Sequence, residues 1–137
     1  MARISLKAFV IGNALAFISS FGLLFAMMII LMLGAPHGTD IQSFKAGLSH
    51  DIRAVVAEAM LTIIAFLATG YITARLAGHD LLLNATLASV GFTIGNIYTL
   101  LKPHANSFDH PLLVVVSWSV PLLTLMGGWI SQRRQSR

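Results

Sequence analysis

The chain has 137 residues, of which 56% are hydrophobic and only 10% are charged, and its mean hydropathy is +0.80. This composition lies outside the usual range of soluble domains, and the length is that of a single domain. The absence of cysteine excludes disulfides, thiolate metal sites and cysteine nucleophiles. The formal net charge is +4, but the basic residues lie at the ends of apolar runs instead of forming a stripe, so nucleic acid is not an expected partner.

Four apolar runs divide the chain, at about residues 8–33, 54–76, 81–101 and 112–130. Each has about 20 residues or more, which is the length of an α-helix that crosses a hydrocarbon core of about 30 Å. We therefore predict an all-α fold, an integral membrane antiparallel four-helix bundle, in which residues 1–137 form a single transmembrane domain. The first run is too long for the apolar core of a secretory signal, so it is expected to remain as a membrane anchor.

Short polar segments connect these runs. Residues 77–80 are too few for anything except a tight helical hairpin, with Gly78 as the C-terminal cap of its first helix. In the longer connection, 34–53, apolar residues recur at helical spacing over 41–48, which leaves a short amphipathic surface helix and a plain loop as equal alternatives.

The distribution of lysine and arginine predicts the orientation. In a four-span arrangement six basic residues lie on one side and three on the other, namely Arg3, Lys7, Arg75, Arg133, Arg134 and Arg137 against Lys45, Arg53 and Lys102. The positive-inside rule places the larger group, and with it both termini, in the cytoplasm. Tyr71 and Trp129 then lie near the inner interface and Tyr98 near the outer one, as expected for an aromatic belt.

Small residues recur at spacings that allow helices to approach closely. In the first run Gly12 and Ala16 belong to a series of small residues at every fourth position, and Gly91 and Gly95 form a GxxxG pattern in the third run. These positions predict helix packing, either within the chain, with a second copy or with another membrane protein subunit.

Glu58 is the most informative polar residue, because a carboxylate at membrane depth is costly unless it faces protein or water. Thr62 and Thr69 follow it on the same helix face. In an antiparallel hairpin Asn96 reaches the same level, and we expect a hydrogen bond between Asn96 and Glu58. One interpretation is a proton or cation site in a small transporter, and the other, which we favour, is polar contacts that hold helices together.

Asn13 and Asn84 lie about one turn inside the cytoplasmic ends of the first and third runs, where they form a second predicted pair. The outer loops contain four of the five histidines, His37, His50, His104 and His110. Their spacing matches no metal-binding motif, and no histidine lies inside a span where it would bind haem. With no nucleophile elbow and no phosphate-binding loop either, we expect no enzyme activity, no cofactor and no metal.

Residues 70–89, GYITARLAGHDLLLNATLAS, resemble a pattern in a family of small uncharacterised four-span inner-membrane proteins of proteobacteria. The matching positions are Gly70, Tyr71, Ala74, Arg75, Ala77, His79, Asp80, Leu82, Leu83 and Asn84. The resemblance implies a four-span topology in the inner (plasma) membrane and carries no catalytic or binding role. In physical terms this hairpin is a packed elbow, in which Asp80 is expected to cap the third helix.

The sequence thus favours a non-enzymatic membrane component that associates with itself or binds a membrane partner, with the lipid bilayer as its solvent. A small transporter that uses Glu58 is the alternative, and a membrane enzyme acting on lipid is a more distant one.

Overall fold

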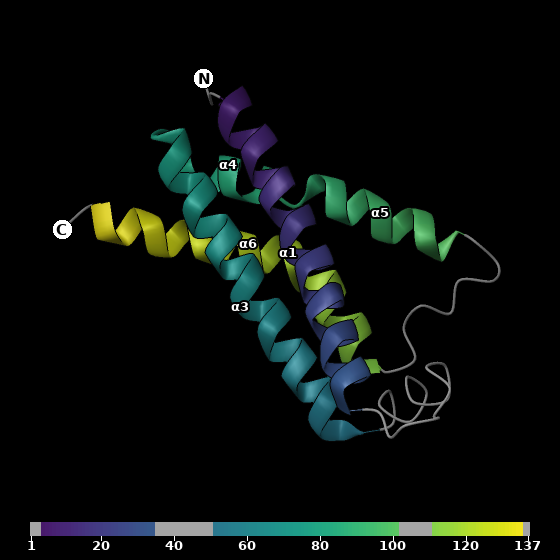
Figure 1. The fold of residues 1–137 in the computed structure, drawn as a ribbon. Helices are drawn as coiled ribbons and strands as arrows, with labels where there is room; N and C mark the ends of the chain where they lie inside the picture. The colour runs from purple at the N-terminus through teal and green to yellow at the C-terminus, as the bar shows by residue number, and fades with distance from the viewer. Residues whose placement is uncertain (1–3, 35–50, 102–110, 136–137) are drawn as a thin grey trace.

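The computed structural model describes residues 4–34, 51–101 and 111–135. Within these residues the chain is all-α and has no strand, and its helices in order are α1 (Leu6–Gly34), α3 (Ile52–Ala77), α4 (Leu81–Leu87), α5 (Val90–Leu100) and α6 (Pro111–Gln135) (Figure 1). The predicted helical bundle is confirmed. The surface helix predicted at 41–48 and the four outer-loop histidines lie outside the described residues.

Among the described residues, four helical segments are long and apolar enough to cross a membrane, by length and composition: Leu6–Leu23, Ile52–Ala77, Leu81–Tyr98 and Pro111–Gln135. At most of their ends, these segments agree with the four predicted runs to within a few residues. The third differs in kind, because it is not one helix. It consists of α4 and α5, which are separated by a turn at Ala88 and Ser89.

The caps of α3 follow from its sequence. The side chain of Asp51 accepts a hydrogen bond from the backbone N–H of Arg53, and Gly78 has a φ of 70° and donates its own N–H to the Ala74 carbonyl. A left-handed C-terminal cap suits glycine, which has no Cβ, so the prediction for Gly78 is confirmed.

Asp80 occupies the N-cap position of α4, but the capping contact predicted for its side chain is not formed. Its backbone has a φ of 41° and a ψ of 51° instead of the extended conformation that a capping residue usually adopts.

α3 and α6 form the most extensive helix contact in the bundle. A Cβ added at Gly70 would collide with the backbone of Thr124, and one added at Gly128 would lie 3.8 Å from the Cβ of Ala74. Position 70 therefore faces 124 and position 74 faces 128, so the two helices run in the same direction. Gly127 completes the contact, because a side chain there would collide with the Leu67 carbonyl oxygen.

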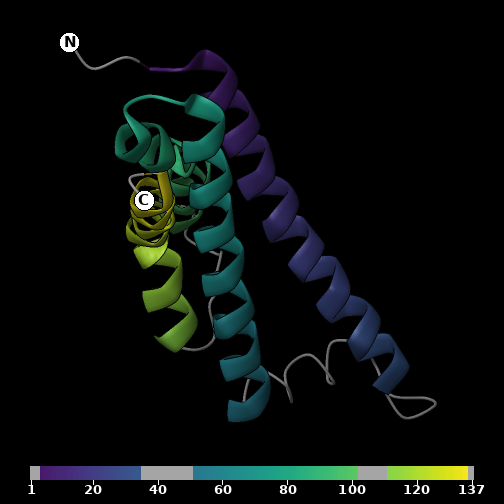
Figure 2. The ribbon, with the colours of Figure 1, turned by 90° about the vertical axis from the view of Figure 1, so that its left-hand side faces the viewer.

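α6 bends near its middle, and its two halves point in clearly different directions in Figures 1 and 2. Pro121 lies inside the helix. Proline has no N–H to donate and its ring displaces the carbonyl four residues earlier, which is the usual cause of a bend. The buried core lies beside this bend, where Ala16, Phe66 and Val120 bring α1, α3 and α6 together.

Candidate functional site

Asn13 of α1 fills the break between α4 and α5. Its side-chain Oδ1 accepts a hydrogen bond of 2.8 Å from the backbone N–H of Gly91, and its Nδ2 donates one of 2.9 Å to the carbonyl of Leu87. In an uninterrupted α-helix the N–H of residue 91 would donate directly to the carbonyl of residue 87. The carboxamide of Asn13 therefore stands in for one broken backbone hydrogen bond of the third span.

The turn at the break is buried against α1 and α6. Gly12 permits this approach, because a Cβ at that position would lie only 2.7 Å from the Cβ of Ala88. On the other side the Thr124 hydroxyl lies 3.3 Å from the hydroxyl of Ser89, which itself donates to the Thr86 carbonyl at 2.9 Å. Ser89 and Thr124 are almost completely buried, so the Ser89 hydroxyl serves the last carbonyls of α4 in a place that water does not reach.

Asn96 plays the same part at the bend of α6. Its Nδ2 donates to the backbone carbonyl of Ser117 at 3.4 Å. Residue 117 lies four positions before Pro121, so its carbonyl is the one that the proline leaves without an N–H donor. Asn96 supplies that missing donor from α5.

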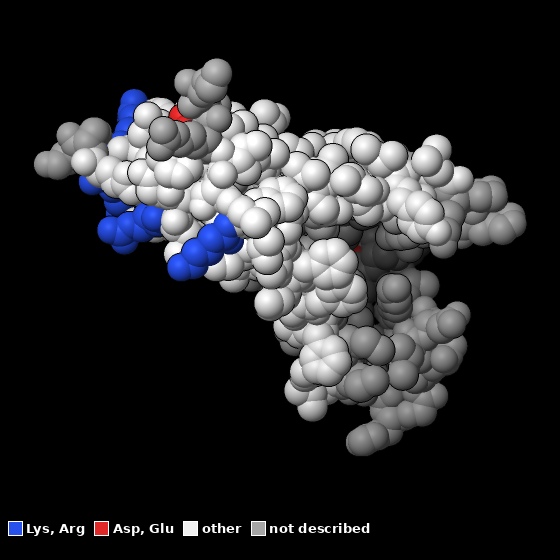
Figure 3. Space-filling view, turned by 90° about the horizontal axis from the view of Figure 1, so that it is seen from above, with Lys and Arg blue, Asp and Glu red and all other residues white. Residues whose placement is uncertain are grey.

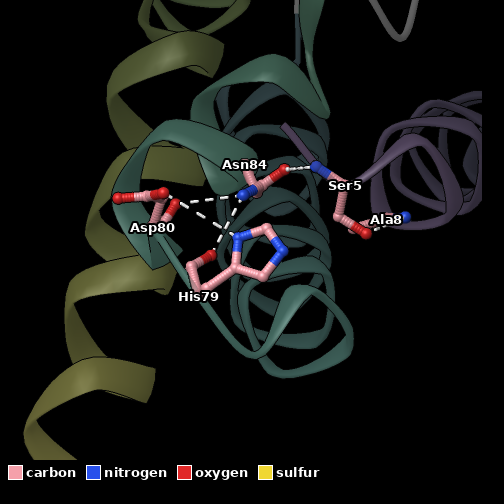
Figure 4. A network of polar contacts seen from close by, with 5 residues as sticks. All are labelled: Ser5, Ala8, His79, Asp80 and Asn84. Carbon is pink, nitrogen blue, oxygen red and sulfur yellow. Dashed lines mark hydrogen bonds and ion pairs between the residues drawn. The ribbon is translucent and has the colours of Figure 1, made fainter. Parts of the chain in front are cut away.

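Asn84 of α4 is fully buried and connects the start of α1 with the turn between α3 and α4 (Figure 4). Its Oδ1 accepts from the N–H of Ser5 at 2.9 Å, and its Nδ2 donates to the carbonyls of His79 and Asp80, each at 3.1 Å. The Ser5 hydroxyl in turn accepts from the Ala8 N–H at 3.3 Å, which caps α1. Asn84 thus ties the start of α1 to the turn between α3 and α4.

The predicted asparagine pairs are therefore not formed. Asn13 and Asn84 both connect α1 with the third span, but each binds backbone groups and not the other side chain. Asn96 binds α6 instead of Glu58, because the break at Ser89 directs α5 mainly toward α1 and α6. Unpaired backbone groups inside an apolar medium are costly, and the amides are used to satisfy them.

Glu58 is half-buried on α3. The hydroxyl of Thr62 donates to the backbone carbonyl of Glu58 at 2.8 Å, and that of Thr69 donates to the carbonyl of Ala65 at 2.9 Å. Both threonines lie on the predicted face, but their hydroxyl protons serve their own helix. The structure thus does not gather Asn96, Thr62 and Thr69 as donors around the Glu58 carboxylate.

The small residues divide into packed and open positions. Gly12 and Ala16 are buried as predicted, and a Cβ on Gly91 would lie 3.0 Å from the Asn13 Oδ1. Gly95 is different, because it is exposed and a Cβ there would meet no other part of the fold within 4 Å. The tight contact at Gly127 was not predicted from the sequence, although the Gly–Gly pair at 127–128 is the signal that marks it.

The described part of the chain contains no group of three or more histidine, aspartate or glutamate residues arranged to hold a metal ion. Comparison with protein-family models, with curated proteins and with solved structures finds no match to this chain. The resemblance of residues 70–89 to the four-span family therefore stays a prediction, and the functional argument depends on the geometry described above.

Proposed function

We propose that this protein is a non-enzymatic multi-pass membrane component that associates with a second copy of itself through α5. The observation that carries the proposal is the unequal use of the GxxxG pattern. A Cβ added at Gly91 would lie 3.0 Å from the Oδ1 of Asn13, whereas a Cβ added at Gly95 would meet no other part of the fold within 4 Å.

The α5 face around Gly95 is apolar and broad. Ile94, Ile97 and Tyr98 are all exposed, and α5 makes much smaller contacts with α1 and α6 than α3 makes with α6. A glycine among large apolar side chains lets the backbone of another helix approach closely, and such approach is the main source of helix association in lipid. A membrane partner other than a second copy would use the same face.

The polar groups inside the spans support a packed component over a transport path. Asn13, Asn84 and Asn96 bind backbone groups at helix ends and breaks, and the threonine hydroxyls beside Glu58 donate to their own helix. These side chains hold the bundle together. The transporter alternative keeps one specific observation in its favour, which is that Glu58, the one acidic residue within α3, is half-buried.

Mass determination of the intact particle in nanodiscs tests the proposal, with wild type compared with Gly95→Leu. We expect the substitution to leave the fold undisturbed, because a Cβ added at this position would meet no other part of the fold within 4 Å. Gly22→Leu is the matched control, since Gly22 on α1 is open in the same way. We expect a defined oligomer in wild type and in Gly22→Leu, and a monomer in Gly95→Leu. A monomer in all three proteins would contradict self-association.

We further propose that the protein lies in the inner membrane with both termini in the cytoplasm. The support is the position of Arg75, Arg133 and Arg134 at the ends of two parallel helices, which the positive-inside rule assigns to the cytoplasm. Because the chain has no cysteine, single-cysteine variants report the side directly. In intact cells an impermeant maleimide should label Arg53→Cys and leave His79→Cys unlabelled, and the reverse pattern would contradict this orientation.

A further inference from the structure

The parallel packing of α3 and α6 brings two basic helix ends together. Arg75 lies in the last turn of α3, and Arg133 and Arg134 lie in the last turn of α6. Because the two helices run in the same direction, their C-terminal ends emerge on the same side of the bundle. In the view from above, the lysine and arginine side chains gather on one side of the described surface (Figure 3).

Two aromatic rings lie among these arginines. The Cζ of Arg75 is 5.9 Å from the ring centre of Tyr71, and the Cζ of Arg134 is 6.0 Å from the same ring, so guanidinium groups from both helices share one tyrosine. The Cζ of Arg133 lies 3.8 Å above the ring of Trp129. The three arginines are exposed, and Trp129 is 44% exposed. Residues 71, 75, 129, 133 and 134 are called the basic–aromatic surface below.

The charge at this end of the bundle is strongly unbalanced. Of the acidic residues in the described ranges, Asp51 and Glu58 belong to the first turns of α3, and only Asp80 lies near the basic end. Asp80 is 3.8 Å from the imidazole of His79. Helix packing and the two aromatic rings thus hold the arginines near one another. The described residues at this end of the bundle contain fewer carboxylates than arginines, so the repulsion between the guanidinium groups is only partly offset.

We propose that the basic–aromatic surface binds the phosphate headgroups of anionic phospholipids. The inference depends on the proposed insertion in a bilayer, where a tyrosine and a tryptophan at the ends of two spans lie at headgroup depth. Guanidinium groups pair with phosphate oxygens through two parallel hydrogen bonds, and aromatic rings beside them keep the forks in position. Phosphatidylglycerol and other anionic lipids supply the negative charge that this end of the fold lacks.

The fluorescence of Trp129 tests this directly. Trp118→Phe leaves Trp129 as the sole tryptophan of the two in the chain. This protein is placed in vesicles of equal parts phosphatidylglycerol and phosphatidylcholine, in which either one or the other lipid is brominated and quenches nearby tryptophan. We expect stronger quenching by brominated phosphatidylglycerol, with the preference falling about fivefold for each of Arg133 and Arg134 replaced by alanine.

Arg53→Ala is the matched control, because it removes the same charge from the opposite end of α3, about 33 Å away along the helix. It should leave the preference intact, and Arg134→Lys should lose less of it than Arg134→Ala, because lysine keeps the charge but cannot form the two parallel hydrogen bonds. Equal quenching by both lipids in the Trp118→Phe protein, or an equal loss in Arg53→Ala, would overturn the proposal while leaving membrane insertion standing. Quenching by neither lipid would instead contradict membrane insertion, and with it the proposed function.

Discussion

Replacing Asn13 with leucine is expected to destabilise the bundle at the α4–α5 break. Leucine has the same branched arrangement of side-chain heavy atoms as asparagine, but it is bulkier and has no hydrogen-bonding groups, so it holds the break open and leaves the Gly91 N–H and the Leu87 carbonyl without their partner. An unsatisfied buried backbone group costs about 1–3 kcal/mol, whereas single hydrogen bonds between helices in membranes contribute about 0.6 kcal/mol on average. Because Asn13 is only half-buried, the lower part of this range applies, and two groups together give about 2 kcal/mol.

Asn13→Ala should cost less, about 1 kcal/mol, because the smaller side chain lets the N–H of Gly91 return to the Leu87 carbonyl and close the helix. The free energy of unfolding is measured by adding dodecyl sulfate to protein in mixed micelles, and amide hydrogen exchange over residues 88–92 reports the break itself. Ser20→Ala is the control, since its hydroxyl donates at 2.8 Å to a carbonyl of its own helix. If Asn13→Leu were as stable as Ser20→Ala, the assigned role of the carboxamide would be wrong.

Three further outcomes are expected. Gly127→Leu should reduce the free energy of unfolding by about 3 kcal/mol in the same micelle assay, because any side chain there collides with the backbone of α3, while Gly22→Leu changes it little. Asn96→Ala should cost about 1 kcal/mol in the wild-type chain but almost nothing in a Pro121→Ala background, where the alanine N–H binds the same carbonyl, and a double-mutant cycle measures this coupling. Glu58→Gln should leave both the oligomer mass and proton flux in proteoliposomes unchanged, and a flux present in wild type and lost in the variant would favour the transporter alternative.

For the three asparagines of the apolar runs, the sequence predicted the positions correctly and the hydrogen-bond partners incorrectly. Their burial cost marked Asn13, Asn84 and Asn96 as side chains that face protein, and the structure places all three at contacts between elements. Their partners were predicted wrongly, because counting turns from helix ends assumes straight and continuous helices. A backbone carbonyl becomes available as a partner only where a helix ends or is broken. The turn at Ala88 and Ser89 itself contains no glycine or proline from which the break could be predicted.

Glycines show the same division. Gly78 was predicted correctly because a C-terminal cap depends on the conformation of a single residue. Gly91 and Gly95 form one pattern in the sequence, yet a Cβ at Gly91 would meet Asn13 of α1 and a Cβ at Gly95 would meet nothing within 4 Å. This difference depends on where α1 passes. Gly127 forms one of the closest approaches in the bundle, and only the path of α3 beside it reveals this.

The sequence by itself determined the number of candidate spans, their approximate limits, the C-terminal cap of α3 and the concentration of arginine at one end of the bundle. These are properties of consecutive residues, because the length and polarity of a helix in a bilayer depend on its own side chains. Only the tertiary structure decided that the third span is two helices, that α3 and α6 run together, and that amides from neighbouring helices complete the broken hydrogen bonds. Those features join residues far apart in the chain, and their energies exist only once the helices have packed.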